Sequence, residues 1–152
     1  VHGNRFTGEP AYFHQIMSST KRLLNDLGRT PQDYTDAVFH QPNAKFPQVA
    51  AKRLGFSDAQ IAPGLLSPQI GNTYSAAALM GLCAVLDIAK PGDTIFVASY
   101  GSGAGSDAYS LVVTDAILER QNRAPRTSAY VARKQFIDYA IYVKWRKELV
   151  MG

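Results

Sequence analysis

Three short polar segments contain the residue types that could do chemistry. The first holds His40, the second holds Asn72, and the third is the glycine- and serine-rich run 101–107. An imidazole changes charge nearest to physiological pH, so His40 could act as an acid, a base or an electrophilic donor. An amide side chain can hold a carbonyl or a water, and the backbone N–H groups of a glycine-rich turn can hold an oxyanion or a thioester carbonyl.

Each segment also has an ordinary structural interpretation. A histidine at the end of an apolar strand can be a structural residue whose ring forms hydrogen bonds within the fold, and an asparagine before a helix can cap that helix. A glycine- and serine-rich turn can simply permit a tight hairpin. The turn is not a phosphate-binding loop, because no Gly-Lys-Ser/Thr follows it. The residues gain a chemical role only if the three segments meet at one cleft.

The surrounding elements predict an α/β layered pattern with a mixed sheet. Apolar residues at helical spacing indicate a long helix from Glu9 to Gly28, and Asn43 can cap a second helix that ends at Gly55. A short buried strand is expected over 36–40, and two further strands over 94–100 and 108–114 favour a hairpin. Sites in open α/β sheets form from the loops at strand ends, so the polar segments could converge.

Other segments are less regular. Short helical turns are expected at 30–33 and 57–60, and the stretch 63–68, rich in proline and glycine, is expected to be an extended surface connection. A helix of small residues over about 75–89 is interpreted as central and buried, because another backbone can approach it closely. One last helix, with aromatic residues and cations, is expected from Thr127 or Ser128 through Val143.

Composition limits the class of protein. With 152 residues, of which 46% are hydrophobic, the chain fits one domain that can bury a core. No apolar run reaches the roughly 20 residues of a membrane span. The formal charge of +4, with basic residues densest near the C-terminus, is interpreted as solvated helix surface rather than as a nucleic-acid site. The chain begins at Val1 without an initiator methionine, which we interpret as a cut or processed end.

Cysteine content is equally informative. The single cysteine, Cys83, excludes an internal disulfide framework and a multi-cysteine zinc site, and it suits a reducing cytoplasm. Cys83 lies within the alanine-rich helix, so we interpret it as a small core residue rather than as a nucleophile.

In their order, the polar segments resemble the C-terminal half of thiolase-superfamily condensing enzymes. The closer resemblance is to archaeal-type hydroxymethylglutaryl-CoA synthases, while the ketoacyl synthase III branch shares the His-Gln-x-Asn and Gly-Asn-Thr pieces. The runs that carry the closer resemblance are Arg5-Phe6-Thr7-Gly8-Glu9-Pro10-Ala11-Tyr12-Phe13, His40-Gln41-Pro42-Asn43-Ala44-Lys45-Phe46-Pro47, Ile70-Gly71-Asn72-Thr73-Tyr74-Ser75 and Ser99-Tyr100-Gly101-Ser102-Gly103-Ala104-Gly105-Ser106-Asp107. Residues 123–125 and 137–140 also look like the ending of that family.

This resemblance implies a fold and a division of the chain. The expected fold is α/β, a thiolase-like layered fold with a mixed β-sheet, of which only the C-terminal half is present. Residues 1–120 would form the C-terminal thiolase-like half-domain, and residues 121–152 a C-terminal helical extension.

The resemblance also implies an acyltransferase activity. The family condenses acetyl-CoA with acetoacetyl-CoA to give hydroxymethylglutaryl-CoA, a step of the mevalonate pathway of isoprenoid synthesis. The CoA thioesters are substrates, and no metal or redox cofactor is implied. A cysteine carries the acetyl group and a glutamate helps form its carbanion, and both lie in the N-terminal half of the family. Without that half, the chain is expected to be inactive.

Individual residues take roles from the same resemblance. His40 matches the histidine that engages the ketone of acetoacetyl-CoA, and Asn72 matches the asparagine that helps fix the acyl carbonyl or a water. Lys45 matches a lysine near the CoA phosphates, with solvated helix surface as an equal alternative. The loop that lines the acyl site corresponds to Tyr100, Gly101, Ser102 and Gly103.

Two other functions stay open. One is a ketoacyl synthase III-like condensing enzyme, and the other is a non-catalytic module for CoA binding or assembly. The expected partners are the N-terminal half of the same enzyme and further copies in a homo-oligomer. An acetoacetyl-CoA thiolase and a small zinc-ribbon/OB-fold protein are implied by the resemblance alone, and neither nucleic acid nor a membrane is expected.

Overall fold

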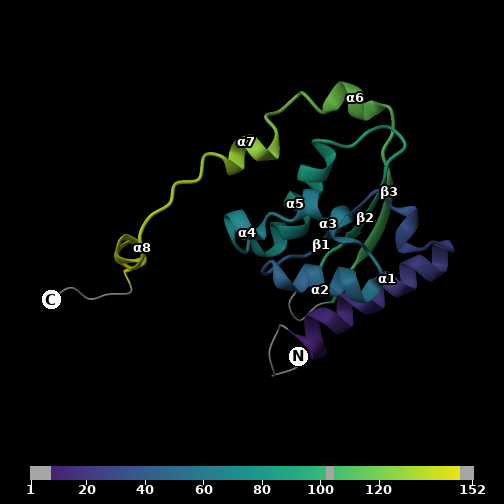
Figure 1. The fold of residues 1–152 in the computed structure, drawn as a ribbon, viewed down its shortest axis with the longest axis horizontal. Helices are drawn as coiled ribbons and strands as arrows, with labels where there is room; N and C mark the ends of the chain where they lie inside the picture. The colour runs from purple at the N-terminus through teal and green to yellow at the C-terminus, as the bar shows by residue number, and fades with distance from the viewer. Residues whose placement is uncertain (1–7, 102–104, 148–152) are drawn as a thin grey trace.

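A three-stranded mixed sheet organises the part of the chain that the computed structural model describes, residues 8–101 and 105–147 (Figure 1). Strand β1 (Asp36–Phe39) pairs in parallel with β2 (Thr94–Ala98), and β2 pairs in antiparallel fashion with β3 (Ala108–Val112). The predicted mixed sheet and the predicted hairpin are therefore confirmed.

Both faces of β1 and β2 are covered. Side chains alternate along a strand, so Phe39 and Phe96 face one layer while Val38 and Val97 face the other. The first layer contains α1 (His14–Leu27), α2 (Lys45–Leu54) and α3 (Asp58–Ile61), and the second contains α5 (Ala77–Leu86). This explains why all four residues of β1 are buried.

The helices of the first layer follow the sequence signals closely. A π-helical turn, Glu9–Phe13, leads directly into α1, and Gly28 ends this helix in a left-handed conformation with φ of 59°. Asn43 accepts a hydrogen bond from the Phe46 backbone N–H at 2.9 Å, which satisfies a free donor at the start of α2. The short turns at Pro31–Asp33 and at α3 each carry a capping box.

The expectation of an extended surface connection over 63–68 is wrong. This stretch contains a 3₁₀ turn, Ala62–Gly64, and the start of α4 (Ser67–Ile70), and Gly64, Leu66 and Ser67 are buried. Its compactness has a physical cause in the side chain of Gln41, which lies among its backbone groups.

Gln41 uses its whole amide to hold this region together. Its Oε1 accepts from the backbone N–H groups of Leu66 at 2.7 Å and Ser67 at 2.8 Å. Its Nε2 donates to the carbonyl of Gly64 at 2.8 Å and to that of Ala77 at 3.3 Å. Because Gln41 directly follows His40, the end of β1 is fastened to the connection before α4 and to the start of α5.

Helix α5 shows the expected close approach, but only one of its sides is buried. A Cβ placed on Gly81 would lie 2.8 Å from the Gly64 carbonyl oxygen and from Val38 Cγ1, so the absence of a side chain is required there. In contrast, Leu79 is 64% exposed and Cys83 is exposed. The interpretations of a central, buried helix and of Cys83 as a core residue are therefore wrong, because the sheet covers a single side of this helix.

The predicted single C-terminal helix is also wrong. The structure has α6 (Ala116–Arg120), which was not predicted, then α7 (Thr127–Val131) and α8 (Tyr139–Trp145). Residues 133–138 are exposed and non-helical, and Asp138 starts α8 afresh by accepting a hydrogen bond from the Ile141 N–H at 2.8 Å.

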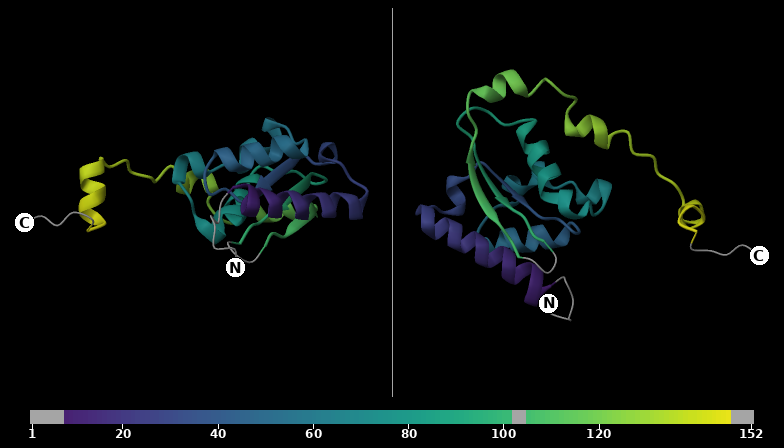
Figure 2. Two further views of the ribbon diagram at one scale, coloured as in Figure 1. Left: turned by 90° about the horizontal axis from the view of Figure 1, so that it is seen from below. Right: turned by 180° about the vertical axis from the view of Figure 1, so that it is seen from behind.

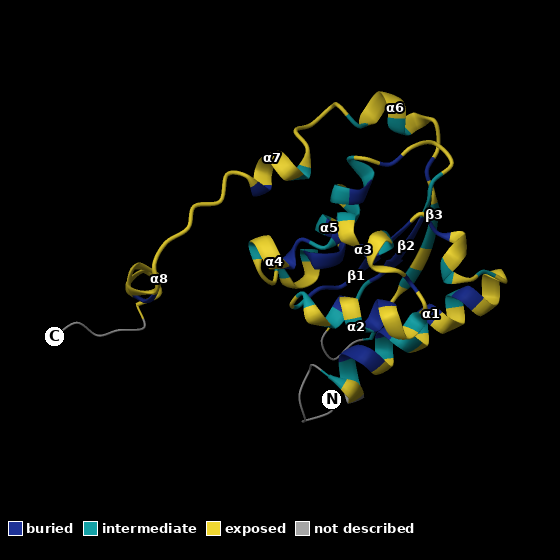
Figure 3. Cartoon of the chain, viewed as in Figure 1, coloured by how far each residue is buried: buried dark blue, intermediate teal, exposed yellow. Residues whose placement is uncertain are grey.

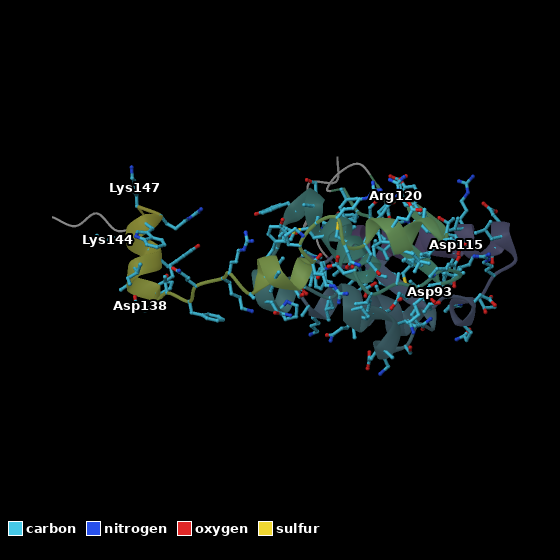
Figure 4. The ribbon with its side chains drawn as sticks, turned by 90° about the horizontal axis from the view of Figure 1, so that it is seen from above. Asp93, Asp115, Arg120, Asp138, Lys144 and Lys147 are labelled. Atoms are coloured by element: carbon cyan, nitrogen blue, oxygen red, sulfur yellow. The ribbon has the colours of Figure 1, made fainter. Side chains whose placement is uncertain are left out.

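The chain that follows α7 and includes α8 extends away from the sheet and its helices (Figures 1 and 2). Most of it is exposed (Figure 3), and Figure 4 shows Lys144 on α8, with Asp138 and Lys147 just before and after the helix, well apart from Asp93, Asp115 and Arg120 on the body. The division of the chain at residue 120 stays a prediction.

Removal of the Gln41 amide tests how strongly it holds the region. Gln41→Leu leaves four buried backbone groups without their partner, and each such group costs about 1–3 kcal/mol. We expect the free energy of unfolding, measured with urea, to fall by about 3 kcal/mol or more. The matched control Gln48→Leu, at an exposed position of α2, should change it by less than about 0.5 kcal/mol. Equal effects of the two substitutions would contradict the assigned role.

Candidate functional site

His40 sits at the carboxyl end of β1, and its backbone is held on both sides. Its N–H donates to the Ala98 carbonyl at 2.8 Å, which continues the pairing of β1 with β2. Its carbonyl accepts from the Tyr12 hydroxyl at 2.6 Å. The residue is only 8% exposed.

The His40 ring lies among aromatic side chains. Its centroid is 5.7 Å from that of Tyr100 and 6.3 Å from that of Tyr12. Burial lowers the pKa of His40 below its ordinary value of 6.5. The imidazole is therefore neutral at neutral pH, with one nitrogen able to donate a hydrogen bond and the other able to accept one.

The glycine-rich turn begins next to this ring. Gly101 and Gly105 exchange backbone hydrogen bonds at 2.9 and 3.2 Å, and the Ser106 hydroxyl donates to the Ser99 carbonyl at 2.5 Å. Tyr100, half-buried, joins the turn to His40 through its ring. The structure thus brings the first and third polar segments together. Ser102 and Gly103 lie outside the described residues.

Asn72 occupies an exposed turn before α5. Its Oδ1 accepts from the Tyr74 backbone N–H at 2.7 Å, and Tyr74 has a positive φ of 52°. This contact closes a local turn and does not cap α5, which begins at Ala77 without a side-chain cap. Within residues 8–101 and 105–147, no hydrogen bond joins Asn72 to His40, and no protein group pairs with its Nδ2.

The segments before and after the Asn72 turn are both anchored to Gln41, the residue that follows His40. Gln41 binds the backbone of Ser67 on one side of the turn and that of Ala77 on the other. Lys45 is exposed in the first turn of α2, and in the described part of the chain it forms no ion pair.

Two residues that sequence analysis did not assign to the site support it directly. In the sequence, Tyr12 is an apolar residue of the first helix and part of a family motif, and Gln41 is part of a second motif. The position of Gln41 after a buried strand is a signal that could have been used, since a buried amide must find partners. Nothing in the local pattern indicates that Tyr12 reaches the His40 carbonyl.

Two other kinds of feature are missing from the described residues. They contain no group of three or more His, Cys, Asp or Glu side chains arranged to hold a metal ion. They also contain no helix with both the length and the apolar character needed to cross a bilayer.

The lowered pKa of His40 predicts a pH-dependent stability. Since the folded state favours the neutral ring, its contribution is fully present above about pH 6.5 and is lost as pH falls through the folded-state pKa. Acidification below pH 6.5 should therefore reduce the free energy of unfolding of the wild type more than that of the His40→Asn variant. His14→Gln, which removes an exposed histidine and leaves His40 in place, is the matched control variant. An NMR titration that gives His40 a pKa above 6.5 would contradict the burial described here.

Comparison with known proteins agrees with the fold and with the motifs. Residues 24–113 match the family described as 3-oxoacyl-[acyl-carrier-protein (ACP)] synthase III C terminal. Among solved structures, PksG, a HMG-CoA synthase from Bacillus subtilis, superposes with a TM-score of 0.70 at 21% identity, over 86% of this chain and 37% of its own. The HMG synthase of the curacin biosynthetic pathway, in complex with an acetyl donor-ACP, gives 0.68 at 25% identity, over 88% and 37%. These matches confirm the thiolase-like α/β fold.

Sequence relatives are closer. A hydroxymethylglutaryl-CoA synthase from Thermococcus kodakarensis is 63% identical over 99% of this chain, and one from Methanosarcina barkeri is 59% identical over 97%. The chain spans only 43% and 42% of the length of these two curated relatives. The predicted resemblance to archaeal-type hydroxymethylglutaryl-CoA synthases is confirmed, and the chain belongs to the family of 3-oxoacyl-[acyl-carrier-protein] synthase III C-terminal domains.

Proposed function

We propose that this chain is the histidine-bearing part of a hydroxymethylglutaryl-CoA synthase, an acyltransferase that condenses acetyl-CoA with acetoacetyl-CoA. The observation that carries the proposal is the contact of the buried His40 ring with Tyr100, at the start of the glycine-rich turn. High identity to archaeal enzymes of that name supports the choice of reaction. The product would enter the mevalonate pathway.

His40 supplies the electrophilic contact in this proposal. When the acetyl carbanion attacks the ketone carbon of acetoacetyl-CoA, negative charge builds on the ketone oxygen. A neutral imidazole donates a hydrogen bond to that oxygen, and burial makes the bond stronger than it would be in water. The lowered pKa of His40 favours this role, because the ring then remains neutral at neutral pH.

Asn72 and the glycine-rich turn hold the acyl group. The turn contact to Tyr74 occupies Oδ1 of Asn72 and leaves the Nδ2 protons to donate to a thioester carbonyl or to a water. The turn contact and the binding interpretation of Asn72 are therefore compatible. In this proposal Tyr100 and Gly101 line the other side of the acyl site, while the predicted roles of Ser102 and Gly103 concern residues outside the described part of the chain.

The nucleophile comes from another part of the enzyme. Acetyl transfer needs a reactive thiolate, and Cys83 is an unsuitable source because it lies in the middle of α5 rather than at the helix N-terminus. In our proposal a further segment supplies the cysteine and the glutamate. The chemistry needs CoA thioesters as substrates and no metal or redox cofactor.

An exposed apolar groove is available to receive that segment. It lies between α5 and the β2–β3 hairpin and is lined by Ser75, Ala78, Leu79, Leu82, Val97, Ser99, Tyr109 and Leu111. Leu79 and Tyr109 are both more than half exposed in this chain, and large apolar side chains on one face usually mark a contact surface. Self-association into a homo-oligomer, and assembly with a thiolase and a zinc-ribbon/OB-fold protein, are further parts of the proposal.

A ketoacyl synthase III-like reaction is the second candidate, since residues 24–113 match the family of that name. The two differ in the acyl acceptor, so the enzyme that contains this chain should be assayed with acetoacetyl-CoA and with an acylated carrier protein. Condensation with the carrier protein alone would favour the second candidate.

His40→Ala tests the role of the imidazole. In the assembled enzyme we expect acetyl transfer to the cysteine to stay near the wild-type rate, because His40 acts on the second substrate. Condensation should fall by roughly 100-fold or more, as is usual when a donor to a developing oxyanion is removed. Mass spectrometry of the acetylated enzyme and a product assay separate the two steps, and equal loss of both would reject the role.

Lys45→Ala tests the predicted contact with the CoA phosphates. An exposed ion pair is worth up to about 1 kcal/mol, so KM for the CoA thioesters should rise by up to about fivefold with kcat unchanged. Lys52→Ala removes another exposed cation of α2, near its far end, and should leave KM unchanged. A Lys45 variant with the wild-type KM would leave only the solvated-surface alternative.

A further inference from the structure

Tyr12 makes the contact that most directly affects the geometry of His40. It is fully buried, with 0% exposure, in the π-helical turn that leads into α1. Its hydroxyl donates to the His40 carbonyl at 2.6 Å across 28 residues of sequence. A single residue far away in the chain is thus joined to the residue that bears the imidazole.

The two backbone hydrogen bonds of His40 fix the position of the backbone from which its side chain extends. The N–H is bound to Ala98 in the sheet, and the carbonyl is bound to Tyr12 outside the sheet. With both peptide groups fixed, the direction of the Cα–Cβ bond is fixed as well. Without the Tyr12 hydroxyl, the His40 carbonyl would lose this hydrogen bond, and the chain after His40 would be anchored through the side chain of the next residue, Gln41.

The phenol keeps its proton over the working pH range. Burial raises the pKa of Tyr12 far above its ordinary value, so the hydroxyl remains a donor. The acceptor is a carbonyl at the end of a buried strand, which would otherwise need another partner.

The Tyr12 ring also contacts the other parts of the site. Its centroid is 5.6 Å from that of Tyr100, at the glycine-rich turn, and 5.2 Å from that of Phe46, in the first turn of α2. Lys45 precedes Phe46. One side chain therefore touches the histidine, the acyl-site turn and the start of α2.

The segment that carries Tyr12 is itself attached to α2. Arg53 Nη1 lies 2.7 Å from Glu9 Oε1, and the Arg53 guanidinium lies over the Phe13 ring at 4.7 Å from its centroid. These contacts come from the residues around Tyr12 and hold its helical turn against the last part of α2.

We propose that Tyr12 is a positioning residue for condensation, which holds the His40 imidazole in line with the ketone of the acceptor through its hydroxyl bond to the His40 carbonyl. The inference rests on the proposed function, since it assigns His40 to the condensation step. Tyr12 itself touches no reacting atom in this account.

The chain offers a matched control in Tyr34. This tyrosine is also buried, at 4% exposure, and belongs to the same apolar cluster as Tyr12. Its hydroxyl has no hydrogen-bond partner in the described structure. Tyr34→Phe therefore removes the same atom from the same core without breaking a hydrogen bond.

The experiment compares substitutions at position 12 in the assembled enzyme. Phe and 4-fluorophenylalanine cannot donate, and the fluorine also fills most of the volume of the hydroxyl, which keeps the variant folded should Tyr12→Phe fail to fold. 4-Aminophenylalanine keeps a donor at the same place. Acetyl transfer, condensation kcat and KM, and the His40 pKa by NMR are measured for each variant and for Tyr34→Phe.

We expect both non-donors to lower the condensation kcat by roughly tenfold to a hundredfold, because a shift of about 1 Å in a catalytic group can cost about a hundredfold. KM and acetyl transfer should stay close to wild type, and in Tyr12→Phe, where water can reach the freed carbonyl, the His40 pKa should rise toward 6.5. 4-Aminophenylalanine should restore most of kcat, and Tyr34→Phe should behave as wild type.

Wild-type condensation by the 4-fluorophenylalanine variant would overturn the inference, and so would equal losses of acetyl transfer and condensation. If the wild type does not condense acetoacetyl-CoA, the proposed function fails instead. The His40 titration then still tests the contact, since an unchanged His40 pKa in Tyr12→Phe would show that Tyr12 does not control the environment of the ring.

Discussion

The need to satisfy buried polar groups at the end of β1 governs the structure around the site. The strand is buried on both faces, and so are His40 and Gln41 that follow it. Their polar groups therefore need hydrogen-bond partners within the protein, because water cannot reach them. The Tyr12 hydroxyl donates a hydrogen bond to the His40 carbonyl, and the Gln41 side chain forms hydrogen bonds with four backbone groups from three surrounding segments. The same bonds that stabilise this strand end hold a neutral histidine beside Tyr100, the residue before the glycine-rich turn.

Local sequence patterns predict the structure correctly at positions where a residue type strongly favours one conformation or one hydrogen bond. Gly28 and Gly55 end their helices with positive φ, and Asn43 caps the start of α2, as the sequence predicts. His40 was placed at a strand end from the apolar run before it. The environment of its ring could not be predicted, because Tyr12 and Tyr100 come from distant segments and meet it only through the packing of α1 and the hairpin.

The wrong predictions have a common cause. Periodicity shows which residues share a face of a helix, but it does not show whether another element covers that face. Cys83 and Leu79 belong to a helix of small residues that packs on the sheet with one side only. Likewise, the aromatic residues near the C-terminus suggested one long helix, whereas Asp138 begins a separate helix after an exposed stretch. The open side of α5 is consistent with a chain that covers less than half the length of its relatives.

The proposed condensation requires that the His40 imidazole meets the ketone of the acceptor thioester. A crystal structure of the enzyme containing this chain, with the nucleophilic cysteine replaced and acetoacetyl-CoA bound, tests this directly. We predict one ring nitrogen of His40 at a hydrogen-bonding distance of about 2.7–3.2 Å from the ketone oxygen, with the Tyr12 hydroxyl still on the His40 carbonyl. A ketone bound elsewhere, with the His40 ring enclosed by protein and out of reach of the ligand, would contradict it.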